Sequence, residues 1–84
     1  MQYNYKKAFT TLKKLGVPVI EGNDNGDDRF FRISAEQNTS ITWADYYQQD
    51  FGLFGVNNMI VDVLSRNGLF AEWINPGALA VHEV

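Results

Sequence analysis

The sequence predicts one small α+β domain over residues 1–84, in the order α-β-β-α-α-β-β, with two hairpins in one antiparallel sheet packed by helices. Three observations lead to this fold class. Apolar residues recur at helical spacing near the N-terminus and again around residue 60. Two pairs of β-rich runs each flank a sequence typical of a tight turn. The 84 residues suit a single domain, and 45% hydrophobic residues can form a core.

The first helix is expected within residues 3–16. Its apolar positions recur every three or four residues: Tyr5, Ala8, Phe9, Leu12 and Leu15. Four lysines fall on the opposite arc, two of them in the last turn, where a helix favours cations. Gly16 is a natural left-handed stop. We interpret the lysine arc as a solvated face, with a basic docking face as the alternative.

The first hairpin is expected from two β-rich runs, Val17–Ile20 and Arg29–Ile33, which flank the acidic stretch EGNDNGDD. Within that stretch Asn25-Gly26 is the dipeptide that a type I′ turn prefers, because both central residues of such a turn need positive φ. The stretch is therefore expected to be a hairpin tip.

A calcium loop is the competing interpretation of the same acidic stretch. Asn23, Asn25 and Asp27 have the spacing of the first ligands of an EF-hand. However, Asp28 stands where the loop requires glycine, and Ser34 stands where it requires glutamate. The sequence therefore predicts a turn without a metal. Three carboxylates at the tip remain candidate contacts for a basic protein partner: Asp24, Asp27 and Asp28.

A short second helix is expected over residues 43–51. The sequence TWAD at residues 42–45 fits a capping box, and an aromatic stripe follows at helical spacing. The members of the stripe are Trp43, Tyr47 and Phe51. The alternative is a strand that continues through Ile41. Tyr46 lies off the stripe and is expected to be partly exposed, and residues 52–55 are expected to be a connector.

A third helix is expected within residues 56–66. Its apolar arc is wide and predicts burial on more than half of its girth. The arc comprises Val56, Met59, Ile60, Val61, Val63 and Leu64. Asn67-Gly68 is expected to end the helix.

The last hairpin is expected from runs 69–74 and 79–84, joined by the turn Asn75-Pro76-Gly77-Ala78. Regular pairing across this turn places Trp73 on one face with Leu69 and Ala71, opposite Ala80, as a principal core residue. The other face then carries Phe70, Glu72, Ile74, Leu79, Val81 and Glu83. Both faces are mostly apolar, although a sheet covered on one side should alternate. The second face is therefore expected to contact either a helix of this domain or a protein partner.

Catalytic signals are sparse. The chain has one histidine, no cysteine and no glycine-rich phosphate loop. We expect no enzyme activity, no metal and no cofactor, and a structural role for His82. The alternative is a small-molecule-binding or enzyme-like domain with a cleft near His82, Glu72 and Tyr46. Glu72 and Glu83 are expected to share one side of the hairpin.

The net charge of −3 and pI near 4.8 make nucleic acid an unlikely partner. No apolar run approaches the length of a membrane span, and no signal-peptide pattern is seen, so a cytoplasmic location is expected. The leading hypothesis is a small acidic protein-binding module that contacts another protein or a second copy of itself. Accessory and inhibitor proteins of phages and mobile elements often have this character. The candidate contacts are Phe70, Glu72, Ile74, Leu79, Val81 and Tyr46, with the acidic tip.

Overall fold

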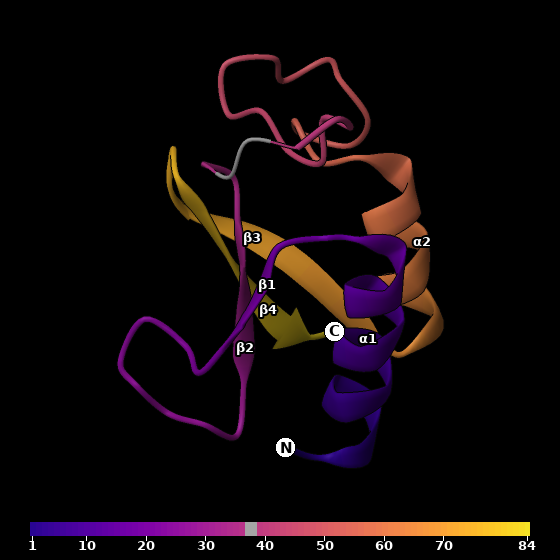
Figure 1. Ribbon diagram of the computed structural model, residues 1–84, viewed down its shortest axis with the longest axis vertical. Helices are drawn as coiled ribbons and strands as arrows, with labels where there is room; N and C mark the ends of the chain where they lie inside the picture. The colour runs from indigo at the N-terminus through magenta and orange to yellow at the C-terminus, as the bar shows by residue number, and fades with distance from the viewer. Residues whose placement is uncertain (37–38) are drawn as a thin grey trace.

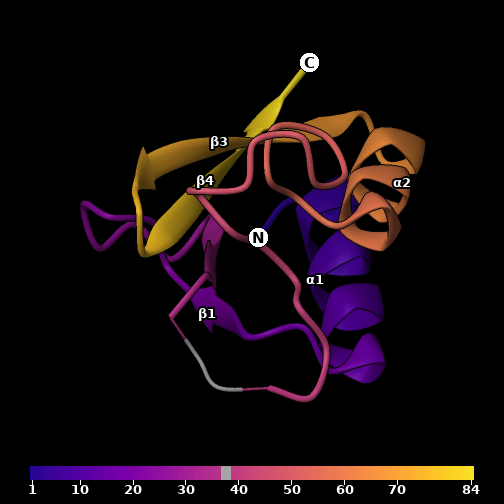
Figure 2. The same cartoon turned by 90° about the horizontal axis from the view of Figure 1, so that it is seen from above.

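The computed structural model describes residues 1–36 and 39–84. The elements of the described chain are α1 (Tyr3–Leu15), β1 (Val19–Glu21), β2 (Phe31–Ser34), α2 (Asn58–Arg66), β3 (Leu69–Asn75) and β4 (Ala78–Glu83). The four strands form one antiparallel sheet in the order β1-β2-β4-β3. Both helices lie on the same side of this sheet (Figures 1 and 2). The predicted α+β class and the two hairpins in one sheet are confirmed.

Pairing between β2 and β4 joins the two hairpins. Two rows of paired residues cross the sheet: Val19, Ile33, Leu79 and Trp73 on the helix side, and Ile20, Arg32, Ala80 and Glu72 on the outer side. The helix side supplies the core, where the large side chains of Phe31, Ile33 and Leu79 are fully buried. The outer side is mixed, since its central row contains Arg32 and Glu72.

Helix α1 begins and ends close to the predicted positions. Gly16 has a φ of 92°, and its N–H donates to the Lys13 carbonyl at 3.1 Å. The N–H of Val17 donates to the Leu12 carbonyl at 3.0 Å, which completes a Schellman end. The buried face comprises Tyr5, Ala8 and Leu12, and Phe9 packs against it.

The acidic stretch forms the tip of the β1–β2 hairpin, although the turn type was predicted wrongly. The N–H of Gly26 donates to the Asn23 carbonyl at 3.0 Å, so Asp24 and Asn25 are the central residues of the turn. Gly26 alone of the predicted pair has a positive φ, 79°. Glycine at the fourth position is typical of a type I turn. The turn is therefore centred one residue earlier than a type I′ turn on Asn25-Gly26.

The helix predicted over residues 43–51 is absent, and the alternative strand through Ile41 is absent too. Ala44 instead forms an isolated β-bridge with Val56, and the N–H of Asn57 donates to the Trp43 carbonyl at 2.9 Å. Successive turns follow from Asp45, whose carboxylate accepts from the N–H of Tyr47 at 3.0 Å. The backbone groups that a helix would need are thus committed to the 55–57 segment, which overrides the capping signal.

The register of the last hairpin was predicted wrongly, and the difference changes which side chains of β4 share a face with Trp73. Trp73 pairs with Leu79 and Asn75 pairs with Ala78, so Ile74 is an extra residue, a β-bulge, in β3. Because side chains alternate along a strand, one inserted residue changes which partner shares each face. Leu79 therefore lies beside Trp73 on the helix side, where regular pairing placed Ala80.

Helix α2 starts at Asn58, two residues later than its apolar pattern suggested. Asn57 caps it by accepting from the Met59 N–H at 2.9 Å. Ile60 and Leu64 are buried, whereas Val61 is only partly buried and Met59 is exposed. The predicted burial of more than half the girth is therefore too large. Part of the apolar arc has no cover within the described chain.

Candidate functional site

A groove of about 590 Å³ lies between the segment 49–56, helix α2 and strand β3. Most of the side chains that line it are apolar. The three walls are successive segments of the chain between residues 49 and 73, so the groove depends on how these segments fold against one another. This feature is the candidate functional site.

The third wall of the groove is formed by the unpaired edge of strand β3. β3 is the last strand in the sheet order and pairs with β4 alone. Residues 69–73 all line the groove. Because successive side chains of a strand point to opposite faces, a groove that contacts five consecutive residues runs along the edge of the strand.

The loop wall presents two apolar side chains to water. Leu53 is 50% exposed and Phe54 is 68% exposed. Phe54 has a φ of 52°, a left-handed conformation that is uncommon for a residue with a Cβ. A Cβ on Gly52 would lie 1.9 Å from the Val56 carbonyl oxygen, and one on Gly55 would lie 2.3 Å from the Asp45 oxygen. Both flanking positions are therefore restricted to glycine.

Trp73 joins the loop wall to the strand wall. Its indole Nε1–H donates to the Phe54 carbonyl at 2.8 Å. The ring of Tyr46 packs edge-on against Trp73 with centroids 5.4 Å apart, and Tyr47 packs edge-on against Tyr46 at 5.4 Å. The predicted position of Trp73 on the core side with Leu69 and Ala71 is confirmed, but Trp73 is only partly buried. It holds the strained loop in place.

The α2 wall consists of Val61, Leu64 and Ser65. Beside it Arg66 contacts Asp62, with Nε and Oδ2 3.1 Å apart one turn away on the helix. The charge of Arg66 is therefore paired with the carboxylate of Asp62 on the same helix.

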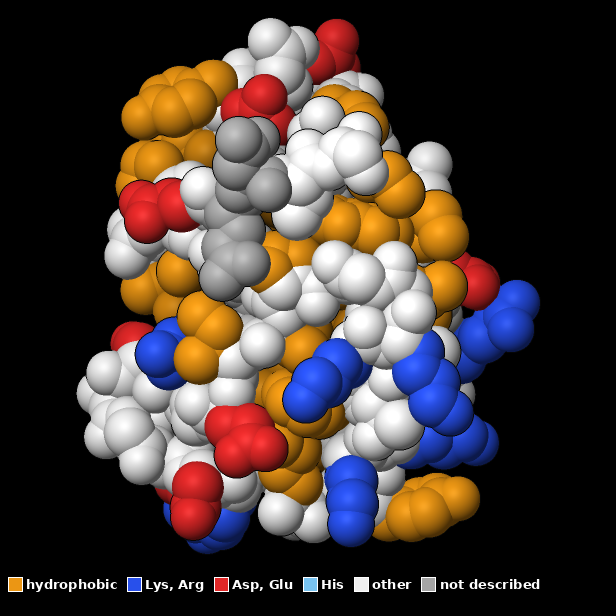
Figure 3. Space-filling model, in the orientation of Figure 1, with side chains coloured by type: hydrophobic (Ala, Val, Ile, Leu, Met, Phe, Trp, Pro, Cys, Tyr) orange, Lys and Arg blue, Asp and Glu red, His pale blue; other side chains and the backbone are white. Residues whose placement is uncertain are grey.

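The charged side chains of the segments that form the groove are mostly acidic. Glu72 is the one ionisable side chain among the described lining residues. Residues 39–84 contain five carboxylate side chains, one arginine and no lysine, whereas all four lysines belong to α1. In Figure 3 blue side chains lie over the middle and lower parts of the face shown, whereas red side chains occur from its top to its lower part.

Because of the bulge, the residues predicted for one apolar contact face lie on different sides of the sheet. Leu79 and Val81 are buried in the core, so they do not belong to an outer face, and this prediction is corrected. Phe70, which is 42% exposed, and Glu72 line the groove. Ile74 is exposed at the bulge.

The predicted cleft near His82, Glu72 and Tyr46 is not assembled. His82 Nε2 lies 3.3 Å from Glu72 Oε1, but both side chains are exposed on the outer side of the sheet. Tyr46 packs on Trp73 instead, and neither Tyr46 nor His82 lines the groove. Glu83 pairs with Leu69 and lies on the helix side, so it does not share a face with Glu72 as predicted.

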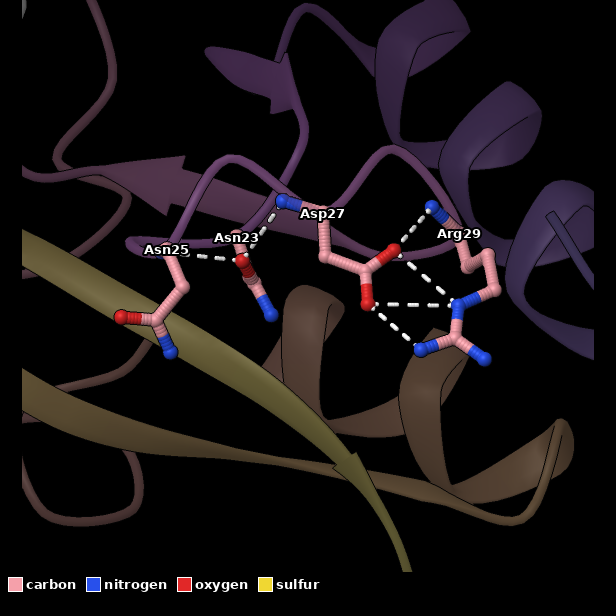
Figure 4. Close-up of polar contacts among 4 residues, drawn as sticks. All are labelled: Asn23, Asn25, Asp27 and Arg29. Atoms are coloured by element: carbon pink, nitrogen blue, oxygen red, sulfur yellow. Dashed lines mark hydrogen bonds and ion pairs between the residues drawn. The ribbon is translucent and has the colours of Figure 1, made fainter.

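The side chains of Asn23 and Asp27 in the acidic tip contact their own loop (Figure 4). The Asn23 Oδ1 accepts from the N–H groups of Asn25 and Asp27 at 2.9 and 3.0 Å. The Asp27 carboxylate accepts from the Arg29 guanidinium at 2.7 Å, and this hydrogen bond lowers the pKa of Asp27 to about 2. Asp24 and Asp28 are exposed. Within residues 1–36 and 39–84 no cluster of carboxylates and histidine has the arrangement of a metal site.

Sequence reasoning missed the loop residues and the exposed side of α2. Leu53 and Phe54 were interpreted as a connector, although two glycines around an apolar pair are a signal of a tightly constrained turn. The wide apolar arc of α2 was a second signal, since Val61 on that arc is only partly buried and lines the groove.

Comparison of the chain with protein families, with curated proteins and with solved structures found no match. Among the described residues, no helix combines the length and apolar character that crossing a membrane requires.

Proposed function

We propose that this chain is a protein-binding module whose contact surface is the groove and its aromatic rim. The observation that carries the proposal is the Gly52–Gly55 turn, which holds Leu53 and Phe54 in water on a constrained backbone. A left-handed residue with a Cβ costs about 1–2 kcal/mol. Strain of this kind is concentrated at binding and catalytic sites, where surrounding structure maintains it.

The chemistry of the groove supports a protein partner over an enzyme substrate. Sites for small molecules combine an apolar lining with a few convergent polar groups. In the described chain no charged or polar residue is buried, and the polar residues at the groove, Gln49, Ser65 and Glu72, are exposed. Exposed aromatic side chains around an apolar groove are typical of protein interfaces.

A selection from a random peptide library displayed on phage tests the proposal. The immobilised protein is expected to enrich peptides that bind the Phe54→Ser variant at least about tenfold more weakly, because an aromatic anchor at an interface contributes about 2 kcal/mol or more. Tyr3→Ser is the matched control, since Tyr3 is 80% exposed on α1 and does not line the groove.

Two results would contradict the proposal. One is a selection that enriches no peptide, or peptides whose affinity is unchanged by Phe54→Ser. The other is saturable binding of a fluorescent fatty acid in the groove that selected peptides cannot displace, since the volume of about 590 Å³ is also within the range of small-molecule pockets.

A further inference from the structure

We infer, on the basis of the proposed function, that the groove binds an extended segment of alternating apolar and basic residues, which adds to β3 as a fifth strand. An edge strand presents a row of backbone N–H and C=O groups to any extended chain that can approach. Addition of a peptide strand to such an edge is a recurring mode of recognition. β3 is an edge of this sheet, and the groove lies along it.

The dimensions of the edge fit a short peptide. Residues 69–73 line the groove, and at about 3.3 Å per residue they span about 17 Å, the length of five or six extended residues. In the described chain, the backbone hydrogen bonds made outside regular helices and strands involve none of residues 70–74. Their outward-facing groups are therefore available to a new strand.

The two sides of the groove differ, and this difference sets the side-chain pattern of the partner. α2 and the loop stand on the helix side of the sheet, where Leu53, Val61 and Leu64 offer apolar contacts. The outer side carries Phe70 and Glu72, which share a face because they are two residues apart. A strand added here directs alternate side chains to the two sides. Apolar residues are thus expected toward α2, and lysine or arginine beside Glu72.

Charge favours a basic partner over a second copy of this chain. Two copies paired through β3 would bring the same acidic segments together, since a two-fold interface uses one surface twice. Glu72 of one copy would face the strand that carries Glu72 of the other, and like charges across a strand pair are destabilising. Residues 39–84 offer one arginine against five carboxylates, so a second copy supplies little compensation.

Binding of two designed peptides, measured by fluorescence anisotropy, tests this inference. The first is a terminally blocked hexapeptide of alternating valine and lysine, and the second replaces each lysine by glutamate. The wild-type protein is expected to prefer the lysine peptide by about fivefold, the upper range for an exposed ion pair. Glu72→Lys is expected to reverse the preference. Glu21→Lys makes the same charge change on β1, at the opposite edge of the sheet, and should leave the preference unchanged.

A backbone readout separates strand addition from contact through side chains alone. Methylation of alternate backbone nitrogens in the lysine peptide removes hydrogen-bond donors, and binding should weaken by more than about tenfold if two such bonds are lost. Equal binding of the methylated peptide would overturn the inference.

The other possible binding results distinguish a failure of the strand-addition inference from a failure of the protein-binding proposal. If library peptides bind through Phe54 but neither designed peptide binds, strand addition is wrong and the protein-binding proposal stands. If neither library nor designed peptides bind, both proposals are wrong. A dimer that Glu72→Lys dissociates or strengthens, seen by sedimentation, would identify a second copy as the occupant and would overturn the inference of a basic partner.

Discussion

Replacing Phe54 by glycine tests two properties of this residue separately. One is the backbone strain that lowers the stability of the fold, and the other is the role of the side chain in binding. Phe54 has a φ of 52° and its side chain is 68% exposed, so the residue contributes few contacts to the fold. At an ordinary position glycine is about 0.5–1 kcal/mol less favourable than alanine, because the unfolded chain loses more freedom on folding. At a left-handed position that order should invert.

The magnitude follows from three contributions. Release of the left-handed strain favours the glycine variant by about 1–2 kcal/mol. The greater entropy of the unfolded chain opposes it by about 0.5–1 kcal/mol. Both Phe54→Gly and Phe54→Ala lose the buried third of the ring, a common loss of about 0.5–1 kcal/mol. The glycine variant should therefore be about as stable as the parent and about 0.5–1 kcal/mol more stable than the alanine variant.

Equilibrium urea unfolding of the three proteins, followed by circular dichroism, measures these differences. For a chain of this size 1 kcal/mol corresponds to about 4–8 °C in Tm, so thermal scans should resolve the order. Both variants are also expected to lose binding of library-selected peptides. An alanine variant as stable as the glycine variant would refute the argument that Phe54 stores backbone strain, and retained peptide binding would refute its role as an anchor.

Three further predictions concern the fold. Leu79→Ala should cost about 2–5 kcal/mol in urea unfolding, because Leu79 is fully buried, whereas Phe70→Ala should cost less than about 1 kcal/mol; the reverse order would contradict the bulged register. Gly52→Ala should cost about 2–5 kcal/mol from its left-handed φ and backbone clash, and a neutral result would show that the loop can rearrange. The Asp27 carboxyl should titrate at about 2 by NMR, and its pKa should rise in Arg29→Gln. The stabilising contribution of the Asp27 carboxylate is complete above the usual aspartate pKa and disappears as pH falls through about 2. Unfolding of the protein at a pH above the usual aspartate pKa would therefore need another cause.

The parts of the fold that local sequence signals determine were predictable. The end of α1 depends on Gly16 and its immediate neighbours, and the structure has the expected left-handed stop. The register of the last hairpin depends on non-local packing. The bulge at Ile74 places Leu79 and Val81 on the helix side, where regular pairing would have placed Ala80 and His82. Burial of two large apolar side chains is more favourable than burial of an alanine and an imidazole, which explains the extra residue.

The groove was harder to predict because it depends on tertiary contacts between successive segments of the chain, and the helix predicted over residues 43–51 was wrong. The TWAD pattern at residues 42–45 is a strong local helix signal, yet Asp45 accepts from the Tyr47 N–H, and the chain turns back toward residues 55–57. Phe70 and Glu72 were among the predicted contact residues, and both are exposed. Phe54 was not selected, since nothing in its local sequence shows that it meets Trp73 nineteen residues later.

Chemical-shift mapping is the most direct test of the claim that the groove is the binding surface. Unlabelled peptide from the library selection is added to ¹⁵N-labelled protein, and amide shifts are followed to saturation. The largest shifts are expected at residues 52–56, 61–65 and 70–73, in the three walls of the groove. Shifts confined to the lysine face of α1 or to the acidic tip at residues 23–28 would contradict this expectation.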